Sequence, residues 1–243
     1  MKNFLIYPLL TLYLTIIFLP GIVFAHQPRI VSNDFTVISN PEISQAFYGE
    51  LKGVPAEFQI KSDSEFSLYV GILVPDIPNI KKDISVEIYK IDGEKKEMLA
   101  MLDGTKFDWF AFYEEFGGDN YFWGPEYKAE ESLTAIGLMG KIVPAGDYRI
   151  KVYSPSNLGK YSLVTGYLES FPFTEILNAL ILVPKLKLNF FNKPLSEILF
   201  APFVLGPVIL VSLLSVGAYI LRLKYKNLYP KKNTVRDNDL KIF

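Results

Sequence analysis

Hydrophobic and polar residues alternate along much of the stretch 26–170, with the two-residue period of a strand that buries one face. In 65–74 the apolar positions are Phe66, Leu68, Val70, Ile72 and Val74. In 146–153 Tyr148, Ile150 and Val152 share one face, and Asp147, Arg149 and Lys151 share the other. We expect the apolar faces of both segments to lie in the core.

Further short segments read as strands and are separated by turn residues; they are 34–39, 44–51, 57–61, 84–88, 97–102 and 160–167. Asp92-Gly93 between two of them predicts a hairpin with a type I′ turn. About eight short strands with regular turns favour a mainly β fold, an antiparallel, jelly-roll-like β-sandwich over 26–170.

The pattern changes at Ile198, because the 24 residues to Leu221 include no charged side chain. A helix of this length, at roughly 1.5 Å per residue, crosses a hydrocarbon core of about 30 Å. The sequence predicts a transmembrane helix at 198–221. The segment 222–243 has seven basic and two acidic residues, which predicts a cytoplasmic tail.

The N-terminus has Lys2, an apolar run from Phe4 to Phe24, and small residues at Val23 and Ala25. This pattern is typical of a signal peptide over 1–25, and the length of the run also fits an uncleaved anchor. Either alternative places 26–197 outside the cell membrane, as a single-pass protein with a cytoplasmic C-terminus.

The segment 171–197 links the predicted sandwich to the predicted span. Its apolar part, 173–183, is too short to cross a bilayer. Lys185, Lys187, Phe190 and Phe191 favour a juxtamembrane segment at the headgroup level of the lipid bilayer. The alternatives are a partial membrane insertion and a helix packed under the sandwich.

Composition excludes several classes of site. Residues 26–197 include 17 basic and 24 acidic residues, an acidic balance that disfavours nucleic-acid binding. The chain has no cysteine, so it has no disulfide or thiol nucleophile. His26 is the only histidine, which is too few for a histidine-based zinc site. No cofactor or metal site is predicted.

The stretch 107–127 contains ten aromatic residues in 21 positions. Gly117-Gly118 and Gly124-Pro125 predict a long irregular loop, which is uncommon unless functional or packed on itself. As a binding surface it would use Trp109, Phe112, Tyr113, Asp119, Tyr121, Trp123, Glu126 and Tyr127. The alternative is that many of these rings close one end of the sandwich.

The segments "SQAFYGELKG" and "PAGDYRIKVYSPSNLGKYSLVTGY" resemble the bacterial pre-peptidase C-terminal type of β-sandwich, whose final hairpin has a GxY strand followed by a GxYxL strand. The matching residues are Gly49, Gly146, Tyr148, Val152, Gly159, Tyr161 and Leu163. The resemblance covers about a third of the exported region. It implies a sandwich fold and no active site.

Three functions fit the sequence. The first is a membrane-anchored binding or scaffolding module that contacts an envelope polymer or a partner protein through the aromatic and acidic stretch. The second is a structural subunit of a membrane complex. The third is a glycan-acting enzyme with Asp119 and Glu126 as its carboxylates, whose separation the sequence does not provide.

Overall fold

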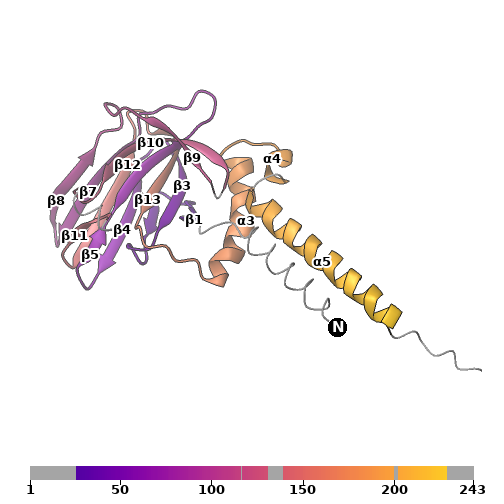
Figure 1. Cartoon of the computed structure of the whole chain (residues 1–243). Coiled ribbons are helices and arrows are strands. Elements are labelled where there is room, and N and C mark those ends of the chain that lie inside the picture. Colours follow the sequence, from indigo (N-terminus) through magenta and orange to yellow (C-terminus); the bar gives the residue numbers. More distant parts are fainter. Residues whose placement is uncertain (1–25, 116, 131–138, 200–201, 229–243) are drawn as a thin grey trace, which may run out of the picture. The chain divides into compact units, whose positions relative to one another are not determined.

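The computed structural model describes residues 26–115, 117–130, 139–199 and 202–228 (Figure 1). The expected signal segment 1–25 and the tail from 229 onward lie outside these residues, as does Phe116. Two compact units are formed. The strands all belong to Ile22–Val204, and the second unit contains most of the helix α5 (Pro202–Leu228).

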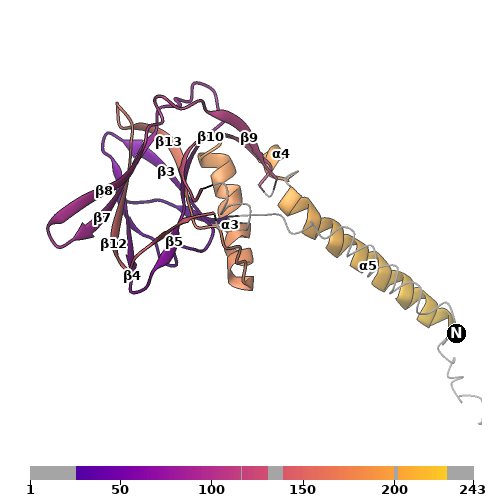
Figure 2. The same ribbon diagram turned by 60° about the vertical axis from the view of Figure 1, so that its left-hand side comes forward.

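Two main β-sheets face each other in the larger unit (Figures 1 and 2). The six-stranded sheet has the order β1 (Gln27–Ile30), β3 (Gln45–Lys52), β13 (Leu158–Thr165), β6 (Val70–Pro75), β10 (Asp119–Tyr127), β9 (Phe110–Glu114). The five-stranded sheet has the order β2 (Phe35–Val37), β4 (Ala56–Ser62), β12 (Gly146–Tyr153), β7 (Ser85–Asp92), β8 (Lys95–Leu102). A small third sheet pairs β5 (Phe66–Leu68) with β11 (Lys141–Val143).

The mainly β fold is confirmed, but the sheets are mixed and not purely antiparallel. Strands β1 and β3 are parallel, as are β2 and β4. The cause is the alternation of the first four strands between the sheets. Each passage to the opposite sheet reverses the direction of the chain. A chain that forms one strand in the opposite sheet therefore reverses twice, and its next strand in the first sheet is parallel to the previous one.

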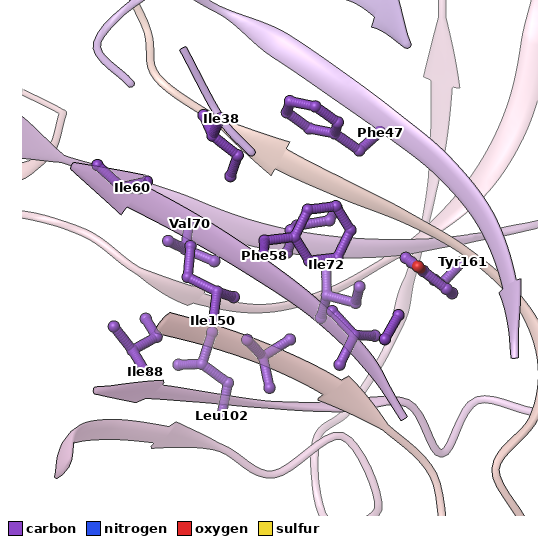
Figure 3. Packing of buried hydrophobic residues seen from close by; sticks show 14 of the residues in the cluster. Ile38, Phe47, Phe58, Ile60, Val70, Ile72, Ile88, Leu102, Ile150 and Tyr161 are labelled. Carbon is purple, nitrogen blue, oxygen red and sulfur yellow. The ribbon is translucent and has the colours of Figure 1, made fainter. Parts of the chain in front are cut away.

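The residues with two-residue alternation form the core between the sheets, as expected (Figure 3). The five alternating apolar residues of 65–74 are buried there, and Tyr148, Ile150 and Val152 are fully buried. The segment 65–74 is nevertheless not one strand. It divides at Tyr69 into β5 and β6, which belong to different sheets, and Tyr69 points away from this core into a second apolar cluster.

The last two predicted strands are present but do not form a hairpin. Strand β12 lies in the five-stranded sheet and β13 in the six-stranded sheet, so they face each other across the core. Two residues of the pre-peptidase C-terminal pattern, Gly49 and Tyr161, have a packing role. They are cross-strand neighbours, and a Cβ atom on Gly49 would lie 2.5 Å from the Tyr161 ring. Only glycine leaves room for that ring.

The hairpin at Asp92-Gly93 is confirmed, with a different turn. Asp92 pairs with Lys95, which leaves Gly93 and Glu94 as the central residues. Gly93 has a φ of 57°, whereas Glu94 has a negative φ. A type I′ turn requires positive φ at both positions, so the turn is not of that type.

The helix α3 (Phe173–Asn189) covers part of the outer face of the six-stranded sheet (Figure 2). Leu186, Phe190 and Phe191 pack there on Ala46 and Val164. The expected boundary at residue 198 is shifted, because the short helix α4 (Leu195–Leu199) comes first and α5 begins at Pro202. Over the residues that the structure describes, no helix has the combined length and apolar character needed to cross a membrane.

The register of β12 makes a direct prediction about stability. Ile150 is fully buried, so Ile150→Ala should lower the free energy of unfolding by about 2 to 5 kcal/mol through lost contacts and a residual cavity. Lys61→Ala removes an exposed side chain that makes a surface ion pair with Asp147, and it should change stability by at most about 0.5 kcal/mol. Urea unfolding followed by tryptophan fluorescence measures both. Equal losses would contradict the register.

Candidate functional site

The aromatic stretch is a β-hairpin and not the irregular loop that the sequence predicted. Strands β9 and β10 pair antiparallel from Glu114 opposite Asp119 to Phe110 opposite Trp123. The glycines that the sequence predicts to interrupt this stretch are accommodated within the hairpin. Gly117 and Gly118 lie in its turn, and Gly124-Pro125 lie in a bulge where β10 pairs with β6. Aromatic residues favour strands, and this preference prevails over the glycines.

The rings of the hairpin divide between two apolar clusters. Trp109, Phe122 and Tyr127 pack against the main core between the sheets. Phe112, Tyr121 and Trp123 instead join the second cluster, on the outer face of the six-stranded sheet beside α3. Within β10 the alternation separates Phe122 from Tyr121 and Trp123, and the register shift between Trp123 and Glu126 turns Tyr127 to the core side.

Trp109 has the contacts of a structural residue. Its Nε1 donates a hydrogen bond to the Gly104 carbonyl at 2.8 Å. Its ring lies against Gly124, where an added Cβ would approach the indole to 2.6 Å. Trp109 therefore fills space between the bulge of β10 and the loop before β9, and it is removed from the candidate contact surface.

Asp119 is buried and forms the centre of an ionic cluster. Lys187 Nζ donates to both carboxylate oxygens at 2.9 and 3.0 Å, and the two side chains are only 2% and 4% exposed. Lys193 adds a second ion pair with Asp119 at 3.0 Å. The sequence had placed Lys187 at the headgroup level of the bilayer. It lies instead in the contact between α3 and the sheet.

Glu126 also has fixed partners. The Tyr69 hydroxyl donates a hydrogen bond to its carboxylate, and Lys128 pairs with it at 3.0 Å. Burial and the charge of Glu126 raise the pKa of Tyr69. Asp119 and Glu126 are therefore both paired with lysines, an arrangement suited to holding the hairpin in place.

A small cavity of about 30 Å³ lies under α3, and its lining combines apolar side chains with the polar residues His26, Tyr48, Glu114, Asp119 and Tyr121. The Tyr48 and Tyr121 hydroxyls lie 3.1 Å apart, and burial raises the pKa of both. Burial also lowers the pKa of His26 to about 4. The volume suits an ordered water. No three potential metal ligands among His, Cys, Asp and Glu gather anywhere in the described residues.

A larger groove of about 300 Å³ lies between α3 and the adjoining strands. Its lysines and acids include Lys52, Glu50 and Lys185, and its apolar wall includes Phe190. Lys160, which also lines it, donates to the carbonyl oxygens of Asn189 and Phe190 at 2.8 Å and so caps the end of α3. No sequence motif marked these residues, because they come from three separate segments.

An exposed aromatic surface remains on the edge strand β9. Phe110 and Tyr113 are each 53% exposed. Phe110 stacks on Trp123 with ring centroids 6.4 Å apart, and Phe112 packs edge-on against Trp123 at 4.9 Å. We call Phe110, Phe112, Tyr113 and Trp123 the β9 surface, in which Phe110, Phe112 and Trp123 share one face of the hairpin and Tyr113 lies on the opposite face of the same edge strand. Of the eight predicted binding residues, Phe112, Tyr113 and Trp123 belong to it, and the other five have packing or ionic contacts within the fold.

Comparison with protein-family models finds no match, and comparison with curated proteins finds none. Among solved structures, the chain is distantly similar to the pre-peptidase C-terminal domain of a collagenase from Bacillus anthracis, with 9% identity and a TM-score of 0.28 over 58% of this chain and 95% of that one. It is also similar to the catalytic domain of a GH87 alpha-1,3-glucanase, with 15% identity and a TM-score of 0.25 over 51% of this chain and 22% of that one. Neither similarity identifies a function.

The assignment of Trp109 as a structural residue is testable. Trp109→Ala should lower the free energy of unfolding by about 3 to 5 kcal/mol, as expected for a large aromatic that packs on the core. Tyr113→Ala, on the exposed edge, should cost at most about 0.5 kcal/mol. Thermal or urea unfolding of the two variants gives the comparison. A stable Trp109→Ala protein would return this ring to the contact surface.

The buried ion pair predicts a non-additive result. Asp119→Leu leaves the buried charge of Lys187 without its partner and should destabilise the protein by about 3 to 5 kcal/mol, whereas Lys187→Met should cost less because Lys193 still pairs with Asp119. The double variant removes both charges and should regain most of the loss caused by Asp119→Leu, while Lys193 keeps its ion pair with Glu197 at the helix α4. A double-mutant cycle of unfolding free energies measures the coupling. Additive losses would mean that the pair is not formed.

Proposed function

We propose that this chain is a membrane-tethered binding module, held outside the cell membrane, that contacts a partner protein through the β9 surface. The tether and the orientation rest on the sequence: the uncharged run 198–221, the basic tail after it and the signal-like N-terminus. The acidic balance of 26–197 disfavours nucleic acid as a partner on electrostatic grounds.

The observation that carries the proposal is the exposure of Phe110 and Tyr113 on an edge strand. Strand β9 is the last strand of its sheet within the described residues, so one side of its backbone faces no neighbouring strand of this chain. Such an edge is a template for an extended segment of another chain. Aromatic side chains beside it would add contact area at low entropic cost.

The hairpin is well suited to present this surface rigidly. Trp123 is held between Phe110 and Phe112, and its strand β10 is paired on both sides. The ionic cluster at Asp119 fixes the other end of β10 to α3. A surface that is ordered before binding loses little conformational entropy when the partner docks.

Site-specific crosslinking in cells tests the proposal. A photoreactive phenylalanine analogue that replaces Tyr113 should form a discrete adduct that protease digestion removes, because the partner is expected to be a protein. The matched control places the same analogue at Met101 on β8, the edge strand of the other sheet, where the side chain is 52% exposed. That position should give no such adduct.

A second variant separates binding from folding. In this experiment the photoreactive analogue replaces Phe107, which is 37% exposed at the start of the same stretch. Phe110→Ser combined with Tyr113→Ser should abolish the adduct that this analogue forms. The double variant should not lower the unfolding midpoint. Met98→Ser combined with Met101→Ser should leave that adduct unchanged. An adduct resistant to protease but removed by glycan hydrolases would identify an envelope polymer instead, and no adduct from either edge would overturn the proposal.

A further inference from the structure

The helix α3 has a buried apolar face and, beside it, a broad exposed apolar face. The inner face packs on the six-stranded sheet through Ala179, Val183 and Leu186. The outer face is exposed and is formed by Phe173, Ile176, Leu177, Leu180, Ile181 and Leu188, of which Phe173 is 70% and Ile181 59% exposed. These six positions recur at helical spacing over about 15 residues, roughly 22 Å at the rise of an α-helix.

Polar contacts at both ends of α3 determine which face is turned outward. Near the first turn, Arg29 donates to both carboxylate oxygens of Glu175 at 2.8 and 3.0 Å, and these hydrogen bonds lower the pKa of Glu175. In the last turn, Lys187 is buried on Asp119, and Lys160 binds the terminal carbonyl groups. The helix cannot rotate its exposed apolar face inward without breaking all three contacts.

We propose that this outer face of α3 lies on the surface of a lipid bilayer, with the helix axis parallel to the membrane. The proposal rests on the membrane tether proposed above. Helix α3 ends at Asn189, and eight residues separate it from the uncharged run that begins at Ile198. Even fully extended, this linker spans at most about 28 Å, so the end of α3 must lie close to the point where the run enters the bilayer.

The charge of α3 agrees with a lipid surface. All residues from 173 to 189 are described, and Lys185 is the single exposed charged residue among them. Glu175 is neutralised by Arg29, and Lys187 by Asp119. The exposed part of the helix therefore presents apolar side chains, the uncharged polar residues Thr174 and Asn189, and one cation, which suits the boundary between acyl chains and anionic headgroups.

The composition of the face also favours lipid over a protein partner. Its six residues are three leucines, two isoleucines and one phenylalanine, without tyrosine, tryptophan or arginine. Protein contact sites concentrate their binding energy in those three absent types, and leucine is under-represented there. The β9 surface has the opposite composition, with aromatic rings and no aliphatic group larger than alanine.

Fluorescence quenching in vesicles tests this proposal on the full chain. Because the chain has no cysteine, a single introduced cysteine can be labelled with an environment-sensitive fluorophore at one chosen position. We would label Ile181→Cys and Leu177→Cys on the outer face, Val211→Cys within the uncharged run, and Lys95→Cys at the exposed start of β8. Each protein is reconstituted into vesicles of equal parts phosphatidylcholine and phosphatidylglycerol that contain lipids with a nitroxide quencher, placed either near the headgroup or deep in the acyl chain.

If α3 lies on the bilayer, the labels at 177 and 181 are quenched by the shallow nitroxide more than by the deep one, and their emission shifts to the blue. The label at 211 should be quenched more strongly by the deep nitroxide, and the label at 95 by neither. Quenching at 211 without quenching at 177 and 181 would overturn the position of α3 and leave the tether intact. No quenching at 211 would overturn the tether itself. Blue-shifted labels at 177 and 181 that neither nitroxide quenches would show a protein partner or a second copy on this face, and would also overturn the proposal.

Discussion

The ion pair between Lys187 and Asp119 is the contact on which the outer layer of this protein depends. It joins α3 to the end of β10 across 68 residues of sequence, and both side chains are almost completely buried. A buried pair costs desolvation energy that its attraction only partly recovers, so it adds little to net stability. Its value lies in specificity. An apolar helix with two similar faces could pack on an apolar sheet in several rotations, and a lysine that must reach one carboxylate selects a single rotation.

That selection has consequences on both sides of the contact. On the sheet, Asp119 opens β10, so the pair fixes the strand that supports Trp123 and the exposed ring of Phe110. On the helix, it turns Leu177 and Ile181 outward. Together with the contacts of Arg29 and Lys160 at the two ends of α3, this buried pair determines which face of the helix is turned outward.

The core was predictable from sequence because it depends on short-range alternation. The core-facing residues of 65–74 and 146–153 follow from the two-residue period alone, whereas the burial of Tyr69 and Leu73 on the other face of the first segment does not. Which sheet receives each strand was not predictable in this way. Tyr69 joins two segments with the same alternation that enter different sheets, and β12 and β13 separate although their sequence resembles a hairpin. Pairing partners are set by contacts distant in sequence, which local periodicity does not encode.

The candidate site was likewise predictable only in the part that depends on local sequence. The sequence singled out the aromatic stretch 107–127, and the exposed rings of Phe110 and Tyr113 lie within it. Composition could not separate these rings from Trp109, whose role depends on the bulge at Gly124 and on the Gly104 carbonyl. Composition also made Asp119 and Glu126 look like free acids, because their lysine partners and Tyr69 are supplied by other parts of the fold.

The two exposed apolar surfaces argue for two different kinds of contact. A domain that needed only solubility would not leave both an aromatic edge strand and an aliphatic helix face uncovered, since each is an aggregation hazard in water. Their compositions differ in the way that protein contacts and lipid contacts differ. If α3 lies on the bilayer, its inner face holds the six-stranded sheet against the helix, and β9 remains at the far edge of that sheet from β1. The same helix would then remove one hazard by burying its outer face in lipid, and the aromatic edge would remain available to a protein beside the membrane.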